Sequence, residues 1–157
     1  MRIIGIDPGT GILGFGVIDV IKGKLSLVDV GVIRTPVKED DAVRLMTIYE
    51  ELTEIIKQTR PDEMSVEKLF FAQNVTTAMT VAQARGVVLL TAMQAKLKIA
   101  EYTPLQIKQA VTGYGKAEKK QIQEMVRVIL QLKEVPKPDD CADALAAAIT
   151  HSMTIRT

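Results

Sequence analysis

Four carboxylates in the sequence occupy positions from which they could share a metal ion. Asp7 and Glu67 each end a short apolar run, and Asp140 and Asp143 lie three residues apart at the start of an alanine-rich segment. A carboxylate at the end of a buried strand is costly unless it is paired or holds a metal. Because residues i and i+3 share one face of a helix, the four acids predict one shared cation site, of the kind that a metal-dependent nuclease needs.

Each acid alone also has a simpler explanation. Asp7 could merely start a turn, and Glu67 could be a solvated residue at a strand end. Asp140, like its neighbour Asp139, could stabilise a helix N-terminus, an effect of about 0.3–1 kcal/mol for each acid. Asp143 lies beyond the first residues of the helix among alanines, where two like charges on one face call for a cation. Whether Asp139 belongs to the site or to the helix start is left open.

A glycine pattern follows the first acid. Residues 9–14 match G-x-G-x-x-G, but the dinucleotide-binding motif requires a helix next, whereas residues 15–20 have the β-branched composition of a strand. We therefore expect a tight turn between two strands. Backbone N–H groups in such a turn, close to Asp7, suit a metal and a phosphate together.

Charge and aromatic residues favour a polyanionic ligand. The net charge is only +1, yet residues 37–67 carry nine acids against four bases and residues 96–127 carry seven bases against three acids. A basic surface beside an acidic site would hold nucleic acid; the alternative is scatter over solvated surfaces. The adjacent Phe70 and Phe71 could fill the core or stack on an unpaired base, a contact worth about 1–3 kcal/mol per base.

A mixed α/β sheet is predicted to position these residues. Apolar runs and turn residues predict strands at 2–7, 13–20, 24–34, 63–67 and 98–102. Helical periodicity predicts helices at 41–59, 75–94, 105–111, 117–131 and from after Pro138 to about Met153. The first three strands are joined too briefly for crossovers and should be antiparallel, whereas the later strands alternate with helices and should be parallel. We expect a five-stranded sheet with helices on both faces.

The whole chain sets further limits. Its 157 residues, 47% hydrophobic and 25% charged, predict a single domain over residues 1–157. No apolar run approaches the roughly 20 residues that span a bilayer, and an immediate first strand predicts no signal peptide. Cys141 is the only cysteine, which excludes an internal disulfide framework, and a cytoplasmic location is expected. His151 lies about 16 Å along the helix from Asp140 at 1.5 Å per residue, so we expect a structural role.

Several segments, in order along the chain, carry a resemblance to a known family. They are residues 5–10 (GIDPGT), 66–67 with 70 and 72–74, 83–86 (QARG), 108–111 (KQAV), 117–119 (AEK), 140–146 (DCADALA) and 149–151 (ITH). Together they resemble the RuvC family of Holliday-junction resolvases, within the ribonuclease H-like superfamily, nearly from end to end.

The resemblance implies a homodimeric endonuclease that cuts four-way DNA junctions in recombination and repair, with a branch-migration motor complex of RuvA and RuvB type as its partner. The residues that match catalytic, metal-binding acids are Asp7, Glu67, Asp140 and Asp143. The residues that match DNA contacts are Phe70 at the junction centre and Lys108 and Lys119 near the active site. Two points depart from or vary within the family pattern. At position 68, where relatives often carry a neutral Gln, this chain has Lys68, whose side chain could hold a phosphate or point to solvent. At the position of Asp143 some relatives carry His.

The combined prediction is a structure-selective endonuclease that depends on Mg²⁺. Two ions roughly 3.5–4 Å apart would be bridged by Asp7 and flanked by the other three acids, and hard oxygen ligands favour Mg²⁺ or Mn²⁺ over zinc. Residues 75–94, apolar on nearly every side, are the predicted homodimer surface.

Two alternatives stay open. The turn at residues 7–10 is similar to the phosphate loop of actin-like ATPases, which need two such domains to clamp a nucleotide, whereas 157 residues supply one. The second alternative is a DNA-junction binder without catalytic activity, against which the presence of all four acids argues.

Overall fold

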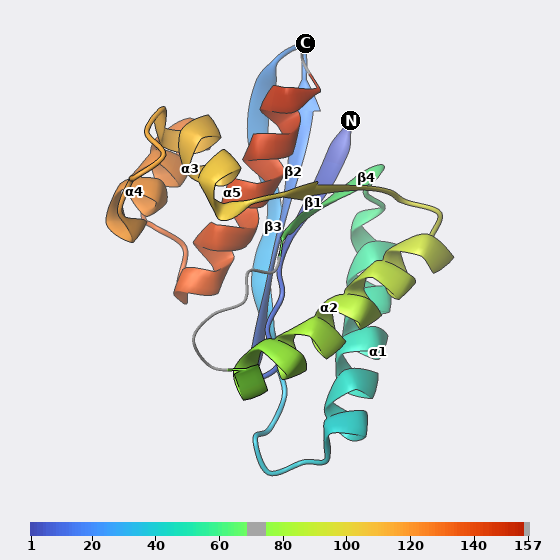
Figure 1. Ribbon diagram of the computed structural model, residues 1–157. Helices are drawn as coiled ribbons and strands as arrows, with labels where there is room; N and C mark the ends of the chain where they lie inside the picture. The colour runs from blue at the N-terminus through green and yellow to red at the C-terminus, as the bar shows by residue number, and fades with distance from the viewer. Residues whose placement is uncertain (69–74, 156–157) are drawn as a thin grey trace.

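The computed structural model describes residues 1–68 and 75–155, and its centre is one mixed five-stranded sheet (Figure 1). The strands are β1 (Arg2–Asp7), β2 (Ile12–Ile21), β3 (Lys24–Arg34), β4 (Glu63–Glu67) and β5 (Lys98–Tyr102). They lie in the order β3-β2-β1-β4-β5. The first three are antiparallel neighbours, and β4 and β5 extend the sheet in parallel from β1, as the connection lengths predicted.

Five helices cover the two faces of this sheet. They are α1 (Asp41–Thr59), α2 (Val75–Gln94), α3 (Pro104–Thr112), α4 (Lys119–Ile129) and α5 (Asp139–Thr154). Figure 1 shows α1 and α2 on one face and α3, α4 and α5 on the other. Each face has its own apolar core, which confirms the predicted α/β architecture. No helix in the described part of the chain is long and apolar enough to span a membrane.

The central strand β1 distributes its side chains between the two cores. Ile4 and Ile6 are fully buried in the core under α1 and α2, whereas Ile3 is buried in the core beneath α5. Gly5 also faces α5: a Cβ built there would overlap the Ala144 carbonyl oxygen and would lie 2.8 Å from the Ala148 nitrogen. The absence of a side chain therefore lets the helix backbone approach the strand backbone directly.

Two predicted boundaries were wrong by a few residues. Helix α4 begins at Lys119 rather than at residue 117, because Glu118 is an extended N-cap that forms a capping box with Gln121. It ends at Ile129 rather than at residue 131. The apolar pattern was misleading because Ala117 and Leu130 are buried beyond the two ends of the helix. The other nine elements agree with the prediction to within one residue at each end.

Candidate active site

Strand alternation brings the first two acids together. Ile6 of β1 pairs with Val66 of the parallel strand β4, and both side chains lie in the core under α1 and α2. Asp7 and Glu67 are the next residue on each strand, so they lie side by side and turn to the opposite face. The Ser65 hydroxyl, on that same face, donates to the Ala147 carbonyl oxygen at 2.7 Å. The two acids therefore face α5.

Helix α5 brings the other two acids to the same end of the sheet. A Cβ at Gly14 would overlap the Asp140 carbonyl oxygen, so the first turn of α5 lies directly against the backbone of β2. Asp143 follows one helical turn later, and its side chain is 28% exposed. Asp140 and Asp143 thereby come within electrostatic reach of Asp7.

The electrostatics of Asp7 show how closely the acids are grouped. Burial, followed by the charges of Asp143, Glu67 and Asp140 in that order, raises the pKa of Asp7 to about 8, while Lys119 lowers it. Burial and then Asp143 raise the pKa of Glu67, while Lys108 and Lys119 lower it. A group of mutually repelling, partly buried carboxylates is the environment in which a divalent cation is favoured.

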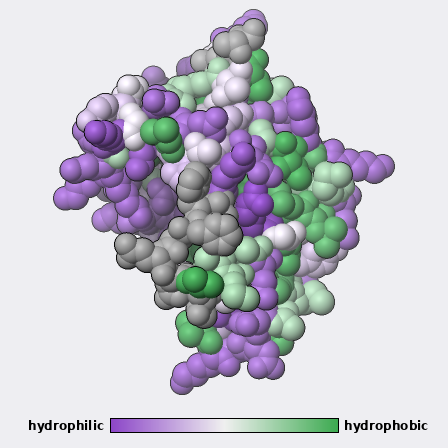
Figure 2. All heavy atoms as spheres, viewed as in Figure 1, coloured by the Kyte–Doolittle hydropathy of each residue, from purple (hydrophilic) through white to green (hydrophobic). Residues whose placement is uncertain are grey.

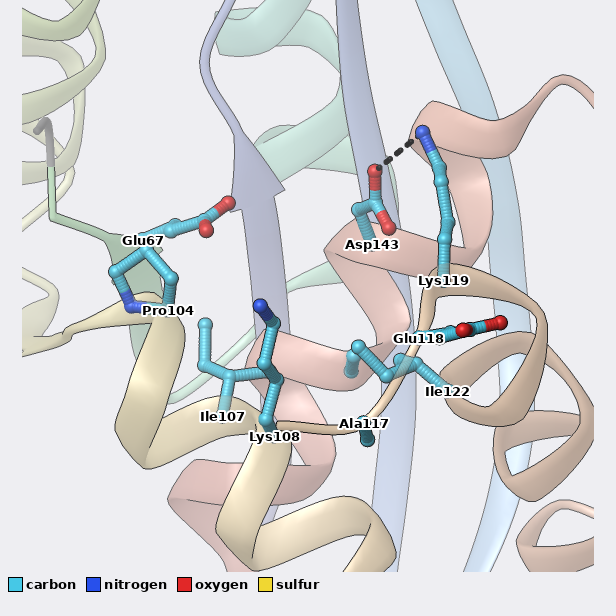
Figure 3. Close-up of a pocket in the computed structure, with 10 residues that line it drawn as sticks. Glu67, Pro104, Ile107, Lys108, Ala117, Glu118, Lys119, Ile122 and Asp143 are labelled. Atoms are coloured by element: carbon cyan, nitrogen blue, oxygen red, sulfur yellow. Dashed lines mark ion pairs between the residues drawn. The ribbon is translucent and has the colours of Figure 1, made fainter. Parts of the chain in front are cut away.

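Two lysines balance part of this negative charge. Lys119 at the start of α4 contacts Asp139 at 3.3 Å and Asp143 at 3.7 Å. Burial lowers the pKa of Lys119, but Asp143, Asp139 and Asp140 raise it above the ordinary value. Figure 3 shows Glu67, Lys108, Lys119 and Asp143 around one open space. This first hollow measures about 480 Å³ and is bordered by α3, α4 and α5 together with the end of β4.

The structure also places Asp139, which the sequence left between two roles. Its side chain is 60% exposed and pairs with Lys119; it lies in the first turn of α5, whose N-cap is Pro138. Among the described residues, no three His, Cys, Asp or Glu side chains converge closely enough to form a ready cation cage. The acids therefore form a negatively charged hollow rather than a closed metal site.

Sequence reasoning missed Tyr102 and Glu63, the two residues through which His151 fixes the far end of α5. His151 is 3% exposed, and its Nδ1 lies 2.7 Å from the Tyr102 hydroxyl while its Nε2 lies 2.5 Å from a Glu63 oxygen. Tyr102 ends β5, and Glu63 begins β4. The pattern that could have revealed Glu63 is the alternation along β4, which puts residues 63, 65 and 67 on one face. His151 thus anchors α5 at the end opposite the acids.

A second hollow, also missed, lies on the other side of Glu67. It measures about 240 Å³, and the described residues that line it include Asp7, Glu67, Lys68 and Arg85. Arg85 comes from α2 on the far face of the sheet and pairs with Glu101 at 2.7 Å. The predicted base-stacking residue Phe70 lies outside the residues that the structure describes.

The sheet order and helix arrangement define the class of the fold, which is ribonuclease H-like. The yeast mitochondrial Holliday junction resolvase Ydc2 shares this fold, with a TM-score of 0.69 over 96% of this chain and 77% of that one at 13% identity. The sequence matches the family model of crossover junction endodeoxyribonuclease RuvC over residues 3–151. The chain therefore belongs to the RuvC family.

Individual relatives agree with this assignment. The chain is 59% identical to the crossover junction endodeoxyribonuclease RuvC of Brevibacillus brevis over 97% of this chain and 92% of that one, and 57% identical to that of Heliobacterium modesticaldum over 98% and 96%. The structure of Thermus thermophilus RuvC matches with a TM-score of 0.92 at 40% identity, covering 99% and 96%. A structure of T. thermophilus RuvC in complex with Holliday junction substrate gives 0.94 at 39%, covering 99% and 95%.

Proposed function

We propose that this protein resolves four-way DNA junctions by paired, Mg²⁺-dependent cleavage of phosphodiester bonds, in recombination and repair. The observation that carries the proposal is the group of four acids, in which burial and then the three neighbouring carboxylates raise the pKa of Asp7 to about 8. Such a site is unfavourable unless it holds a cation, and the lysines beside it suit a phosphate. Membership of the RuvC family is the basis on which we propose branched DNA as the substrate.

The donor set of the acid group fits a hard divalent cation. Asp7, Glu67, Asp140 and Asp143 offer only carboxylate oxygens, which favour Mg²⁺ or Mn²⁺. They come from two strands and one helix that are fixed by backbone contact and by the His151 anchor. Bound Mg²⁺, in the proposed two-ion arrangement, would supply Lewis-acid activation of water and charge neutralisation at the leaving 3′ oxygen. The role of the acids is to hold this charge at the strand ends.

The lysines act on the substrate. Lys108 and Lys119 border the first hollow together with Glu67 and Asp143, so a phosphodiester placed there lies near both ammonium groups and carboxylates. The ammonium groups neutralise the phosphate and hold it within reach of the acids. Phe70 is proposed to stack on a base at the opened junction, as the family resemblance implies.

Cleavage of a synthetic four-way junction in Mg²⁺ tests the mechanism. Asp7→Asn keeps the shape of the side chain and removes one charge, so we expect the cleavage rate to fall by roughly 10²–10³-fold or more, the scale of losing one group that stabilises transition-state charge. Asp41→Asn is the matched control, because Asp41 is an acid at the start of α1, outside the hollow. Its rate should match that of the wild type.

Different results would favour different functions. Full Mg²⁺-dependent activity in Asp7→Asn would contradict the proposed mechanism. Binding of the junction by the wild type without any nicking would indicate a junction binder. A partner complex of RuvA and RuvB type is carried over from the family resemblance, and co-sedimentation of the protein with such a complex on junction DNA tests it.

We further propose that α2 forms the surface of a homodimer. Four large apolar side chains on this helix are between 56% and 66% exposed: Val75, Met79, Leu90 and Met93. Ala82 and Gly86 are exposed between them, so the six positions follow one another at spacings of three or four residues along one stripe. Figure 2 shows apolar residues gathered along the course of α2. An apolar stripe of this length is typical of a surface that another chain covers.

A further inference from the structure

The second hollow brings two cations, Arg85 and Lys68, beside the acids Asp7 and Glu67. We propose that it is a second phosphate subsite, in which Arg85 and Lys68 hold a backbone phosphate of the cleaved strand next to the scissile one. The two hollows share Glu67 and Pro104 as a common wall. A strand that crosses this wall places one phosphate in each hollow. The inference rests on the proposed junction cleavage and extends it to the neighbouring nucleotide.

Arg85 is held in place but is incompletely satisfied. Its side chain is only 19% exposed, and Glu101 binds one Nη nitrogen at 2.7 Å. Among the described residues, no acceptor contacts its buried Nε. A guanidinium offers five N–H donors in a planar fork, and a buried donor without a partner carries a penalty of about 1–3 kcal/mol. An anion in the hollow would use donors that the protein leaves free.

Lys68 adds a second positive charge from a fixed position. Its backbone N–H donates to the Tyr102 carbonyl oxygen at 2.7 Å, which holds the residue at the end of β4 while its side chain stays exposed. The cations that lower the pKa of Glu67 are Lys108 and Lys119 of the first hollow. Arg85 and Lys68 thus form a second pair of cations on the other side of the same acid.

The chemistry selects a phosphate among possible ligands. Arginine binds phosphate oxygens through two parallel N–H bonds, and Arg85 and Lys68 offset the negative charge of the two acids that line the same hollow. Glu101 fixes the orientation of the guanidinium through one Nη nitrogen, so its fork is pre-organised for the ligand. Asp7 also lines this hollow, which keeps the bound phosphate within one nucleotide of the reacting centre.

The experiment combines protein variants with neutral phosphates. A series of junctions is prepared, and each junction carries one methylphosphonate at one of the three linkages on either side of the cut. Each junction is then cleaved under single-turnover conditions with Mg²⁺. For the wild type, a methylphosphonate at one neighbouring linkage should lower kcat/KM by about ten- to hundredfold, the scale of a charge-assisted hydrogen bond. Arg85→Gln should lower kcat/KM on the natural junction to a similar extent, and the same methylphosphonate should have no further effect on this variant.

Two variants separate phosphate binding from a purely structural role. Glu101→Gln weakens the ion pair that orients Arg85 but keeps the guanidinium charge, so its kcat/KM should fall less than that of Arg85→Gln and its sensitivity to the same methylphosphonate should remain. Arg127→Gln removes the same charge and the same kind of pair, with Glu124 on α4, and should match the wild type. The dependence of log K for junction binding on log salt concentration should flatten by about 0.7–0.9 in Arg85→Gln alone, the slope of one phosphate contact.

The outcomes that would overturn the proposal are specific. Equal losses in Arg85→Gln and Glu101→Gln, each with the wild-type methylphosphonate profile, would show that Arg85 only supports the fold. If Arg85→Gln does not fold, Lys68→Gln replaces it, because that side chain is exposed; it must lose sensitivity at the same linkage. A wild-type protein that does not cleave junctions would contradict the proposed function itself, whereas cleavage without coupling would contradict only the second subsite.

Discussion

Helices α2 and α5 have similar apolar sequences but meet their surroundings in opposite ways. In α5 every residue from 141 to 152 is buried except Asp143, and alanines bring its backbone against Gly5 of β1. Helix α2 packs on α1 and β5 with part of its surface and exposes Leu90 and Met93. The apolar character of a helix shows only that other parts of the protein, or another chain, cover it. The size of its side chains and of the side chains opposite helps to tell these two cases apart. Glycine opposite alanine accompanies the packing of α5 on the sheet, whereas the large exposed side chains of α2 form the surface proposed for the homodimer.

The largest expected difference between the surroundings of the two helices is in how pH changes stability, because α5 packs beside the acid group that includes Asp7 and α5 itself carries two of its members. Burial, followed by the nearby carboxylates, raises the pKa of Asp7 from its ordinary value of 3.8 to about 8 in the folded protein, so folding favours the protonated form of this side chain. The resulting stability is fully present below about pH 4 and is lost as pH rises through about 8. Without metal, Asp7→Asn should therefore be more stable than the wild type at pH 9, on the order of 3 to 6 kcal/mol. Urea unfolding of both proteins at pH 5 and pH 9 measures this difference.

Hydrogen exchange locates the same effect. Amides of α5 should exchange faster at high pH, relative to the intrinsic rate, while those of α2 should not. Loss of protection to the same degree in both helices would mean that the acid group does not act through α5.

The next largest effect is steric. Gly5→Ala places a Cβ on the Ala144 carbonyl oxygen, which pushes α5 away from β1 and should cost about 3 kcal/mol, together with much of the junction cleavage. Gly86→Ala on α2 is the matched control, because nothing lies within 4 Å of the added Cβ and alanine favours a helix by up to about 1 kcal/mol. Thermal unfolding of both variants tests the contrast, which equal destabilisation would contradict.

The smallest effect on the folded monomer is expected at the exposed stripe of α2. The double substitution Leu90→Glu and Met93→Glu should leave monomer stability nearly unchanged but weaken dimerisation by at least about 100-fold, or about 2.7 kcal/mol. Val128→Glu on α4 is the control, because Val128 is 49% exposed on another surface. Sedimentation equilibrium measures the change. A dimer that survives both glutamates would place the interface elsewhere, and a monomeric wild type would exclude the dimer.

Much of the fold followed from local patterns. Alternation along β1 and β4, together with their parallel pairing, is enough to place Asp7 beside Glu67, and spacing on α5 places Asp140 near Asp143. The position of α5 along the sheet was not predictable, because it depends on which residues of the helix lie against Gly5 and Gly14 of the strands.

The contacts of Arg85 were out of reach for the same reason. Arg85 and Glu101 are far apart in sequence and on different elements, and only the packing of α2 against β5 brings them together. The arginine therefore carried no local signal of its place beside the acids. His151 was expected to be structural, but its partners Tyr102 and Glu63 again come from separate strands.

The direct contact of α5 with the sheet also determines how constant the geometry of the site can be. Side chains exchange rotamers within picoseconds to nanoseconds, so a gap that is filled by long side chains varies from moment to moment. At Gly5 and Gly14 no side chain separates strand from helix. The spacing between the strand acids and the helix acids is thus set by peptide units in van der Waals contact, and thermal motion of the core side chains leaves it nearly unchanged.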